Sequence, residues 1–317
     1  MNLSYAQNLE DYHLWQALGQ KSPGFYVDVG AGHPIADSVS FWFYERGWHG
    51  VCVEPQRPLA ELYRYIRPRD LVFEGLIGRQ SGEADFHVVD RLHGFSTTIE
   101  KHAENARQYG AEYRSTRVPI TTLPLLCERY GVAEIDFLKI DVEGAEADVL
   151  MGNDWRRIRP KVIVAEALSP GSGEPAWHAW EPFLLRQDYE FTLFDTLNRF
   201  YVAKEQVEIL GRAPRERAAW KCVTHMYEIG RAPENTAHPD HALALELARG
   251  LWAHLPSLDR SILASLLARA RRIEDTEAIQ ALAASFDTDA GRGSLGRIAC
   301  GYDGGQLFDE KGAMAAD

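Results

Sequence analysis

Three acidic side chains follow directly on a short apolar segment in FLKIDVEGAE, residues 137–146. If this segment is a buried parallel strand, its end lies at the edge of the sheet where open α/β proteins bind their ligands. We expect Asp141 and Glu143, at that end, to be catalytic, either as a general base or as an orienting group. Glu146 falls in the first turn of the next helix, where an acid contributes about 0.3–1 kcal/mol, and we expect it to be structural.

Another acid, Glu166, ends the apolar segment KVIVAEA, residues 161–167. Asp141 and Glu166 could bring two oxygen ligands together, which suits a hard cation such as Mg²⁺. The sequence places no third ligand beside them. Proton transfer, metal binding and a structural role therefore all stay open for these acids.

A glycine-rich turn follows the first apolar segment in VDVGAGHP, residues 27–34. Gly30 and Gly32 would let a ligand approach the backbone closely, but the third glycine of the dinucleotide fingerprint is absent. The next strand ends in an acid that can accept hydrogen bonds from ribose hydroxyls. We therefore expect Asp28, Gly30, Gly32 and Glu54 to bind a cofactor. His33 could be a base or an acceptor contact, and it could equally be a solvated loop residue.

Apolar runs and helical periodicity give the elements that must position these groups. We expect strands at 24–30, 50–54, 71–78, 84–89, 135–140, 161–167, 189–195 and 198–203, and helices at 8–18, 37–47, 57–68, 121–131, 144–152 and 174–187. Asp37 or Ser38 could cap the second helix and Gly47 could end it. Strands that alternate with helices indicate a doubly wound parallel sheet, and the closing antiparallel hairpin favours its Rossmann-like class I methyltransferase variant.

Residues 90–117 form a long polar stretch that is partly helical in pattern. Its residues His93, Ser96, Thr97 and His102 could line the acceptor side of a cleft or be exposed loop residues. After about residue 206 the alternation of strands stops, and three segments rich in Ala and Leu predict helices. We expect a domain at 1–205, with residues 1–22 as a helical lid, and a helical C-terminal module at 206–317. We expect its glycine-rich tail, residues 287–317, to be mobile in large part.

Composition narrows the classes of partner. The formal net charge is −12, and no cluster of Lys and Arg points to nucleic acid. The four cysteines form no metal-binding pattern and suit a reducing cytoplasm. The first residues do not resemble a signal peptide, and no apolar run approaches the roughly 20 residues of a membrane span.

Several ordered blocks of the sequence resemble the FkbM family of S-adenosylmethionine-dependent methyltransferases. The blocks, within roughly residues 3–205, are SYAQNLEDYHLWQAL, GFYVDVGAGHPIADSVSFWFYERGW, GVCVEP, FLKIDVEGAEADVL and LFDTLNRFYVA. The resemblance implies S-adenosylmethionine as donor and O-methylation of a hydroxyl, often on a sugar or polyketide. Residue by residue, it implies that Asp28, Gly30 and Gly32 form the cofactor loop, that Glu54 binds the ribose, and that Asp141 lies beside the reacting methyl group.

One departure concerns Gly32 and His33, where many relatives carry Asn or Trp; contacts near the acceptor could differ there. The expected function is thus O-methyl transfer to a small-molecule or glycan acceptor. A nicotinamide-dependent oxidoreductase and a non-enzymatic scaffold are the alternatives. We expect the C-terminal module either to form a homodimer or to cover the acceptor site.

Overall fold

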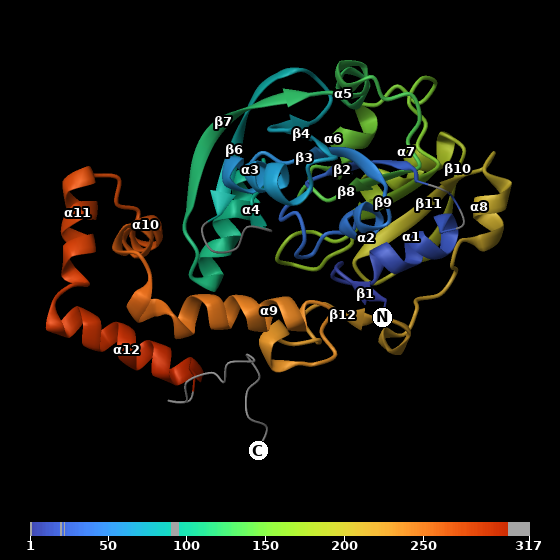
Figure 1. The fold of residues 1–317 in the computed structure, drawn as a ribbon. Helices are drawn as coiled ribbons and strands as arrows, with labels where there is room; N and C mark the ends of the chain where they lie inside the picture. The colour runs from blue at the N-terminus through green and yellow to red at the C-terminus, as the bar shows by residue number, and fades with distance from the viewer. Residues whose placement is uncertain (1, 20, 22, 90–94, 304–317) are drawn as a thin grey trace. The chain divides into compact units, whose positions relative to one another are not determined.

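The computed structural model describes residues 2–19, 21, 23–89 and 95–303, and the chain divides into two compact units, Met1–Met226 and Tyr227–Asp317. A seven-stranded sheet forms the centre of the first unit (Figure 1). In spatial order its strands are β10 (Tyr189–Phe194), β11 (Asn198–Ala203), β9 (Val162–Glu166), β8 (Phe137–Ile140), β2 (Phe25–Val29), β3 (His49–Val53) and β4 (Leu71–Phe73). All strands point the same way except β11, which runs antiparallel to both neighbours. This reversed strand in a parallel sheet confirms the predicted class I fold.

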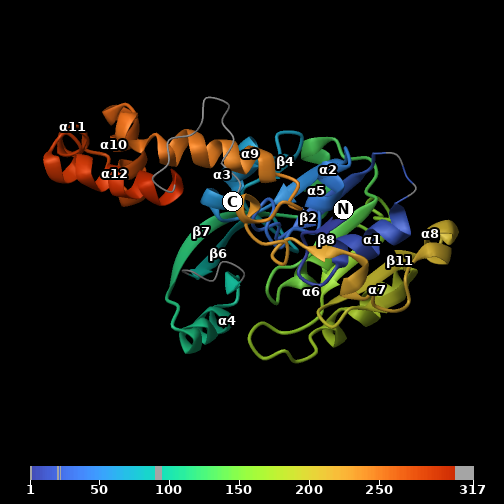
Figure 2. The same cartoon turned by 60° about the horizontal axis from the view of Figure 1, so that its bottom comes forward.

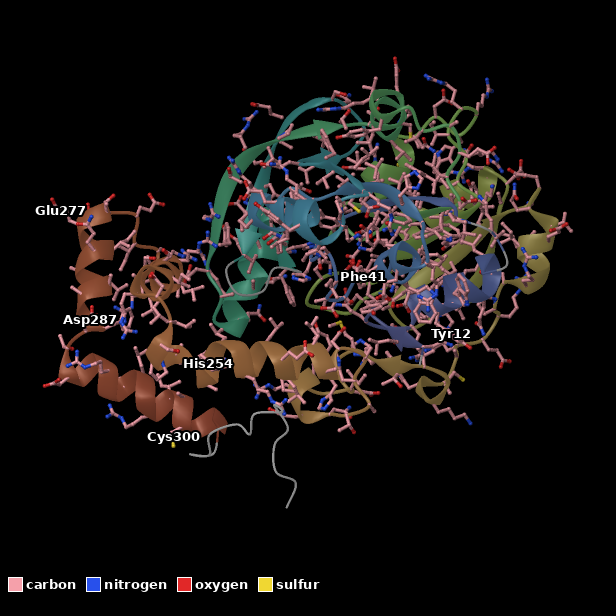
Figure 3. All side chains as sticks on the ribbon, in the orientation of Figure 1. Tyr12, Phe41, His254, Glu277, Asp287 and Cys300 are labelled. Atoms are coloured by element: carbon pink, nitrogen blue, oxygen red, sulfur yellow. The ribbon has the colours of Figure 1, made fainter. Side chains whose placement is uncertain are left out.

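Helices cover both faces of this sheet. On one face lie α1 (Glu10–Leu18), α2 (Phe41–Glu45) and α3 (Arg57–Ile66), which bury Leu14, Trp42 and Tyr63 in a shared core. On the other face lie α5 (Leu123–Tyr130), α6 (Glu146–Met151) and α7 (Glu181–Arg186). The central strands are buried on both sides because helices cover both sides. Tyr12 on α1 and Phe41 at the start of α2 are labelled in Figure 3.

The helix expected at 37–47 is shorter than predicted, so the expected cap was wrong. It begins at Phe41, and neither Asp37 nor Ser38 caps it. Asp37 has a φ of 56°, and the Ser38 hydroxyl accepts a hydrogen bond from Arg67. Residues 30–40 therefore form a long ordered loop after β2, and Gly47, with a φ of 84°, follows the helix as expected.

A second, three-stranded sheet lies to one side of the main sheet (Figures 1 and 2). It consists of β5 (Leu76–Ile77), β7 (Tyr113–Thr121) and β6 (Gly82–Val89), and α4 (Glu100–Asn105) lies between β6 and β7 in the sequence. The strand expected at 71–78 is thus two strands, because the chain leaves the main sheet after β4 and enters the small sheet at β5. The long polar stretch holds α4 and most of β7, whereas His93 lies outside the described residues.

The first unit continues past the expected domain boundary at 205/206. Helix α8 (Val207–Arg212) buries Ile209 in the core that also contains Leu14 and Leu18 of α1. Strand β12 (Thr224–His225) pairs in parallel with β1 (Leu3–Ser4) at the N-terminus. These contacts hold residues 206–226 in the first unit, and the boundary between the units follows Met226.

The second unit is helical, as predicted. Its helices are α9 (His241–Ala248), α10 (Arg260–Arg271), α11 (Thr276–Ser285) and α12 (Asp289–Asp303). Leu255, Leu263 and Leu295 form its small core. Arg260 pairs at 3.0 Å with Asp287, which is labelled in Figure 3. We expected the tail at 287–317 to be mobile in large part, but residues Asp289–Asp303 of it form helix α12. Leu295 of this helix packs into the small core, which explains why the helix is ordered. Residues 304–317 lie outside the described residues. Among the described residues, no helix has both the length and the apolar character required to cross a bilayer.

Candidate functional site

A cavity of about 1250 Å³ opens at the carboxyl edge of the main sheet. It lies where the chain order of the sheet reverses, between β2 and β8, which is the usual ligand crevice of open α/β proteins. The predicted residues that line it are Gly30, Gly32, His33, Glu54, Asp141, Glu143 and Glu166. The fold thus brings together all of the predicted site residues except Asp28.

The two glycines of the turn have different roles. Gly30 has a φ of 76°, and a Cβ atom built on it would lie 1.7 Å from the carbonyl oxygen of Asp141. This glycine therefore allows the turn after β2 to lie directly against the end of β8. Gly32 has a φ of 61°, and a Cβ atom there would meet no atom within 4 Å. Gly32 leaves space for a ligand to approach the backbone.

Glu54 closes one side of this turn. Its Oε2 accepts a hydrogen bond of 2.8 Å from the backbone N–H of Gly32, and its Oε1 accepts one of 2.7 Å from Gln56. Burial raises the pKa of the carboxyl to about 7, against the lowering effect of these two donors. Glu54 is therefore fixed at the cavity wall, and each oxygen keeps lone pairs for a further donor such as a ribose hydroxyl.

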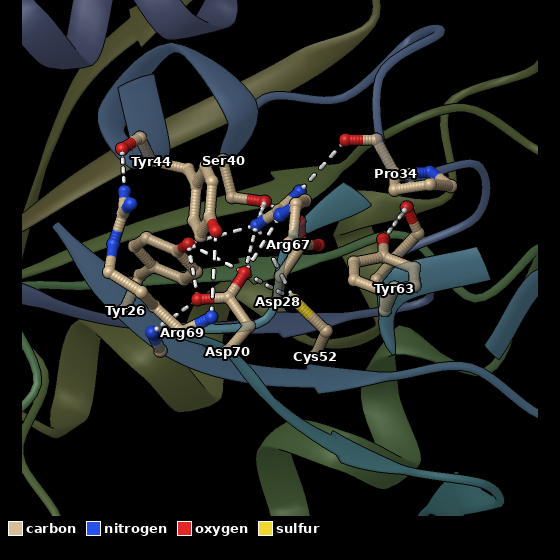
Figure 4. A network of polar contacts seen from close by, with 12 residues as sticks. Tyr26, Asp28, Pro34, Ser40, Tyr44, Cys52, Tyr63, Arg67, Arg69 and Asp70 are labelled. Atoms are coloured by element: carbon tan, nitrogen blue, oxygen red, sulfur yellow. Dashed lines mark hydrogen bonds and ion pairs between the residues drawn. The ribbon is translucent and has the colours of Figure 1, made fainter. Parts of the chain in front are cut away.

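Arg67, the residue directly after α3, anchors the loop from behind, a role that sequence reasoning missed. Figure 4 shows it among Tyr26, Ser40 and Asp70. It pairs with Asp70 at 2.7 Å, both side chains being fully buried, and it donates to the Pro34 carbonyl and to the hydroxyls of Tyr26, Ser38 and Ser40. Tyr63, one turn earlier, donates to the Ala31 carbonyl at 3.1 Å. Two side chains at the C-terminal end of α3, one in its last turn and one directly after it, thus fix the loop between residues 31 and 40.

Asp28 lies behind the cavity wall rather than in it. Its Oδ2 accepts a hydrogen bond of 2.6 Å from Ser40, and its Oδ1 lies 3.5 Å from the Lys139 Nζ. The sheet register places Asp28 directly beside Lys139, so the two side chains share one face of the sheet. Any effect of Asp28 on a cofactor therefore passes through these partners.

Lys139 links the glycine turn to the acidic side chains. Its Nζ donates to the Gly30 carbonyl at 2.7 Å and lies 3.3 Å from the Asp141 Oδ2. Burial opposes its charged form, but the charges of Asp141 and Asp28 outweigh burial and raise its pKa. Its position was visible in the sequence as a lysine inside an apolar strand, FLKI, although it was not singled out.

Three carboxylates gather at the ends of β8 and β9. Asp141, Glu143 and Glu166 each offer an oxygen that lies within 4.8 Å of the others. Burial, followed by the charges of Asp141 and Glu146, raises the pKa of Glu143 to about 9. Burial and the neighbouring acids likewise raise the pKa of Glu166 well above its usual range. The structure thus adds Glu143 to the pair, Asp141 and Glu166, that the sequence suggested.

The backbone of Glu143 is held in a strained conformation. Its φ is 54°, in the left-handed region, and its carbonyl accepts hydrogen bonds from Thr97 Oγ1 at 2.8 Å and from His102 Nδ1 at 3.2 Å. Glu146 accepts from the backbone N–H groups of Val142 and Gly144, and burial raises its pKa to about 7. Glu146 is therefore a loop-holding residue at the start of α6.

His33 is engaged by its own loop. Its Nδ1 accepts hydrogen bonds from the backbone N–H groups of Ile35 and Ala36, at 3.1 and 3.0 Å. A neutral ring that accepts at Nδ1 carries its proton on Nε2. To act as a base, His33 would have to break both bonds, so this geometry favours a loop-ordering role.

The N-terminal segment packs against the closing hairpin at the same edge. Glu10 Oε1 accepts from Asn198 Nδ2 at 2.6 Å, and Asn8 donates to the carbonyl of Asp195 at 2.6 Å. Of residues 2–19, the structure places only Gln7 in the cavity wall, and Leu197 of the hairpin lies there too. The segment borders the cavity, and whether it acts as a lid stays a prediction.

Comparison with known proteins gives a family match over the part of the chain that contains the site. The family model described as a methyltransferase FkbM domain matches residues 28–191, more than half of the chain. Among solved structures, a methyltransferase from Geobacter sulfurreducens is 14% identical with a TM-score of 0.35, covering 63% of this chain and 82% of that chain. A precorrin-6y C5,15-methyltransferase from Geobacter metallireducens is 13% identical with a TM-score of 0.35, covering 63% and 89%. A search of curated proteins finds no match.

Proposed function

We propose that this chain, which belongs to the FkbM methyltransferase family, transfers a methyl group from S-adenosylmethionine to a hydroxyl oxygen of a sugar, a glycan or a related natural product. One observation carries the proposal: a single cavity joins the glycine turn and Glu54 to three clustered carboxylates. The first group suits a nucleoside with an amino acid tail. The second suits an acceptor that must lose a proton.

The residues at the turn fit S-adenosylmethionine. Gly32 leaves open space beside the backbone, and Glu54 presents both oxygens at the end of β3. The absent third glycine and the acidic wall disfavour a pyrophosphate, which argues against a nicotinamide cofactor. Lys139 and Arg67 donate hydrogen bonds to backbone carbonyls of the turn and of the loop after it. Because these bonds involve the protein alone, the pocket is formed before the cofactor binds.

Proton removal is the chemical task of the carboxylates. Bound S-adenosylmethionine supplies an electrophilic methyl group, and its transfer to an alcohol forms a C–O bond, breaks an S–C bond and leaves S-adenosylhomocysteine and one proton. A neutral alcohol is a poor nucleophile, so the chain must help to remove that proton. Asp141, Glu143 and Glu166 can do so in two ways: one carboxylate takes the proton, or the three hold a cation that acidifies the hydroxyl.

The rest of the cavity wall supports a neutral acceptor. The small sheet and the segment that precedes α4 supply an apolar face, through Leu76, Phe86, Phe95, Ile99 and Ile120. The lysine and arginine residues of the described wall are Lys139 and Arg79, which pair with Asp141 and Asp148. Since both are already engaged by acids, the wall favours hydroxyl-rich, uncharged acceptors over phosphorylated ones.

Two experiments test the proposal. Calorimetric titration with S-adenosylmethionine, S-adenosylhomocysteine and NAD should show saturable binding of the first two alone. Incubation with methyl-labelled donor and a panel of free sugars, oligosaccharides and nucleotide sugars should then give alkali-stable labelled ethers. Binding of NAD in place of the sulfonium compounds would refute the assignment, and label found on nitrogen or carbon would refute O-methylation.

A further inference from the structure

We propose that Asp141, Glu143 and Glu166 together form a binding site for one divalent cation, of the Mg²⁺ or Mn²⁺ class, in the wall of the acceptor cavity. Their ligand oxygens lie within 4.8 Å of one another, and all three residues line the cavity. Ligands that are all carboxylate oxygens suit hard cations rather than zinc or copper. The catalytic use of this cation rests on the proposed function, whereas its binding does not.

An unpartnered buried oxygen points to a missing ligand. The Oε2 atom of Glu166 is buried and has no hydrogen-bond partner among the described residues. Leaving a buried carboxylate oxygen without a partner is costly, and a metal ion removes that cost. Glu166 ends β9, beside β8 in the sheet, so this oxygen and Asp141 meet at neighbouring strand ends.

Two residues of the cluster, Asp141 and Glu143, are held in place by separate anchors, as a metal site requires of its ligands. Asp141 is fixed by its backbone bond to the Val29 carbonyl and by Lys139. The carbonyl of Glu143 is fixed by Thr97 and His102. Within the described ranges, the hydrogen bonds that Glu143 accepts go to its backbone carbonyl rather than to its carboxylate. It is therefore free to bind a cation while its backbone stays fixed.

The charges at this site also favour a divalent cation. Lys139 lies 3.5 Å from Asp28 and 3.3 Å from Asp141, and Asp141 also belongs to the cluster with Glu143 and Glu166, so one ammonium group serves four carboxyl groups. When cation binding leaves all four carboxylates ionised, the divalent charge reduces the excess from three negative charges to one, which the sulfonium of the donor balances. A cation held there would lower the pKa of an acceptor hydroxyl that joins it from the cavity, and the hydroxyl proton would pass to solvent water as the methyl group is transferred.

Manganese binding by the full chain tests the proposal directly. Protein freed of metal by a chelator is titrated with Mn²⁺, and free Mn²⁺ is followed by electron paramagnetic resonance. We expect one saturable site, and we expect Asp141→Asn, Glu143→Gln and Glu166→Gln each to weaken it by about tenfold or more. Asp148→Asn is the control, because Asp148 lines the same cavity but lies outside the cluster, and it should bind Mn²⁺ as the parent does.

The outcomes separate this inference from the proposed function. No saturable site, or equal loss in Asp148→Asn, would overturn the inference. S-adenosylmethionine titrations of the same samples report on the proposed function. If the protein binds the donor but not Mn²⁺, the cation site alone is refuted. If it binds Mn²⁺ but not the donor, the methyltransferase assignment alone is refuted. If a variant fails to fold, the unfolding temperature of the parent protein decides, since it must rise with added Mn²⁺ if the site exists.

Discussion

Replacing the two glycines of the cofactor turn by alanine should separate stability from donor binding, because the change at Gly30 mainly lowers stability and the change at Gly32 mainly weakens donor binding. Both residues have a positive φ, 76° at Gly30 and 61° at Gly32, so each alanine costs about 1–2 kcal/mol of folding free energy from backbone strain. At Gly30 the new methyl group also lies 1.7 Å from the Asp141 carbonyl, which must move away. Overpacking of this kind adds about 1–3 kcal/mol, so Gly30→Ala should cost about 2–5 kcal/mol in total.

At Gly32 the methyl group meets nothing within 4 Å and points into the space where the donor is expected. Gly32→Ala should therefore cost only the strain energy, while S-adenosylmethionine binding weakens by about tenfold, or 1.4 kcal/mol. Urea unfolding followed by tryptophan fluorescence reports on the first unit, because every tryptophan except Trp252 belongs to it. Calorimetry on the folded variants gives the affinity. Equal destabilisation by the two substitutions, or unchanged affinity in Gly32→Ala, would refute this account of the turn.

Three further predictions follow from buried charges and from the unit boundary. Arg67→Met should cost about 3–5 kcal/mol in urea unfolding because it leaves Asp70 buried and unpaired, and adding Asp70→Asn should restore much of the loss; no recovery would contradict the pairing. Glu10 is buried near Asp195 and its folded pKa is about 8, above the ordinary value of 4.5, so its contribution to stability is complete below pH 4.5 and is lost as the pH rises through 8. Unfolding free energies measured from pH 5 to 9 should fall less steeply in Glu10→Gln than in the parent, and identical slopes would exclude Glu10 as the source. Truncation after residue 226 should leave a cooperatively folded first unit, whereas truncation after residue 205 should expose the α1 surface that Ile209 covers and lower the unfolding temperature; equal temperatures would place residues 206–226 outside the unit.

The sequence predicted the main sheet well because its strands are short, mainly apolar segments that end at recognisable residues. Gly30 after β2 and Asp141 after β8 mark the ligand edge of the sheet in the sequence alone. The same patterns could not show that residues 71–78 divide between two sheets, since both halves are equally apolar. The predicted start of α2 was wrong because Asp37 and Ser38 are residue types that often cap helices. In the structure Asp37 has a left-handed backbone, and the Ser38 hydroxyl accepts a hydrogen bond from Arg67 instead.

Within the site, the sequence identified the residues at strand ends but not those that hold them. Glu54, Asp141 and Glu166 were found because parallel strands place their carboxyl ends together. Arg67 carries no local signal, since an arginine near the end of an amphipathic helix is usually solvated, and only the tertiary structure buries it beside Asp70. Glu143 was chosen for its charge, whereas its left-handed backbone depends on Thr97 and His102, more than 40 residues earlier in the chain.

That dependence connects acceptor recognition with the chemistry. The segment that carries Thr97 and His102 also carries Phe95, Ser96 and Ile99, which line the cavity. An acceptor that packs against this segment therefore touches the support of the Glu143 carbonyl. If the segment shifts, the left-handed turn at Glu143 loses the bonds that offset its strain, and the carboxylate cluster loses one of its three members. Residues 95–102 should for this reason be altered as a unit when acceptor specificity is changed, because substitutions that merely enlarge the apolar wall would also release Glu143.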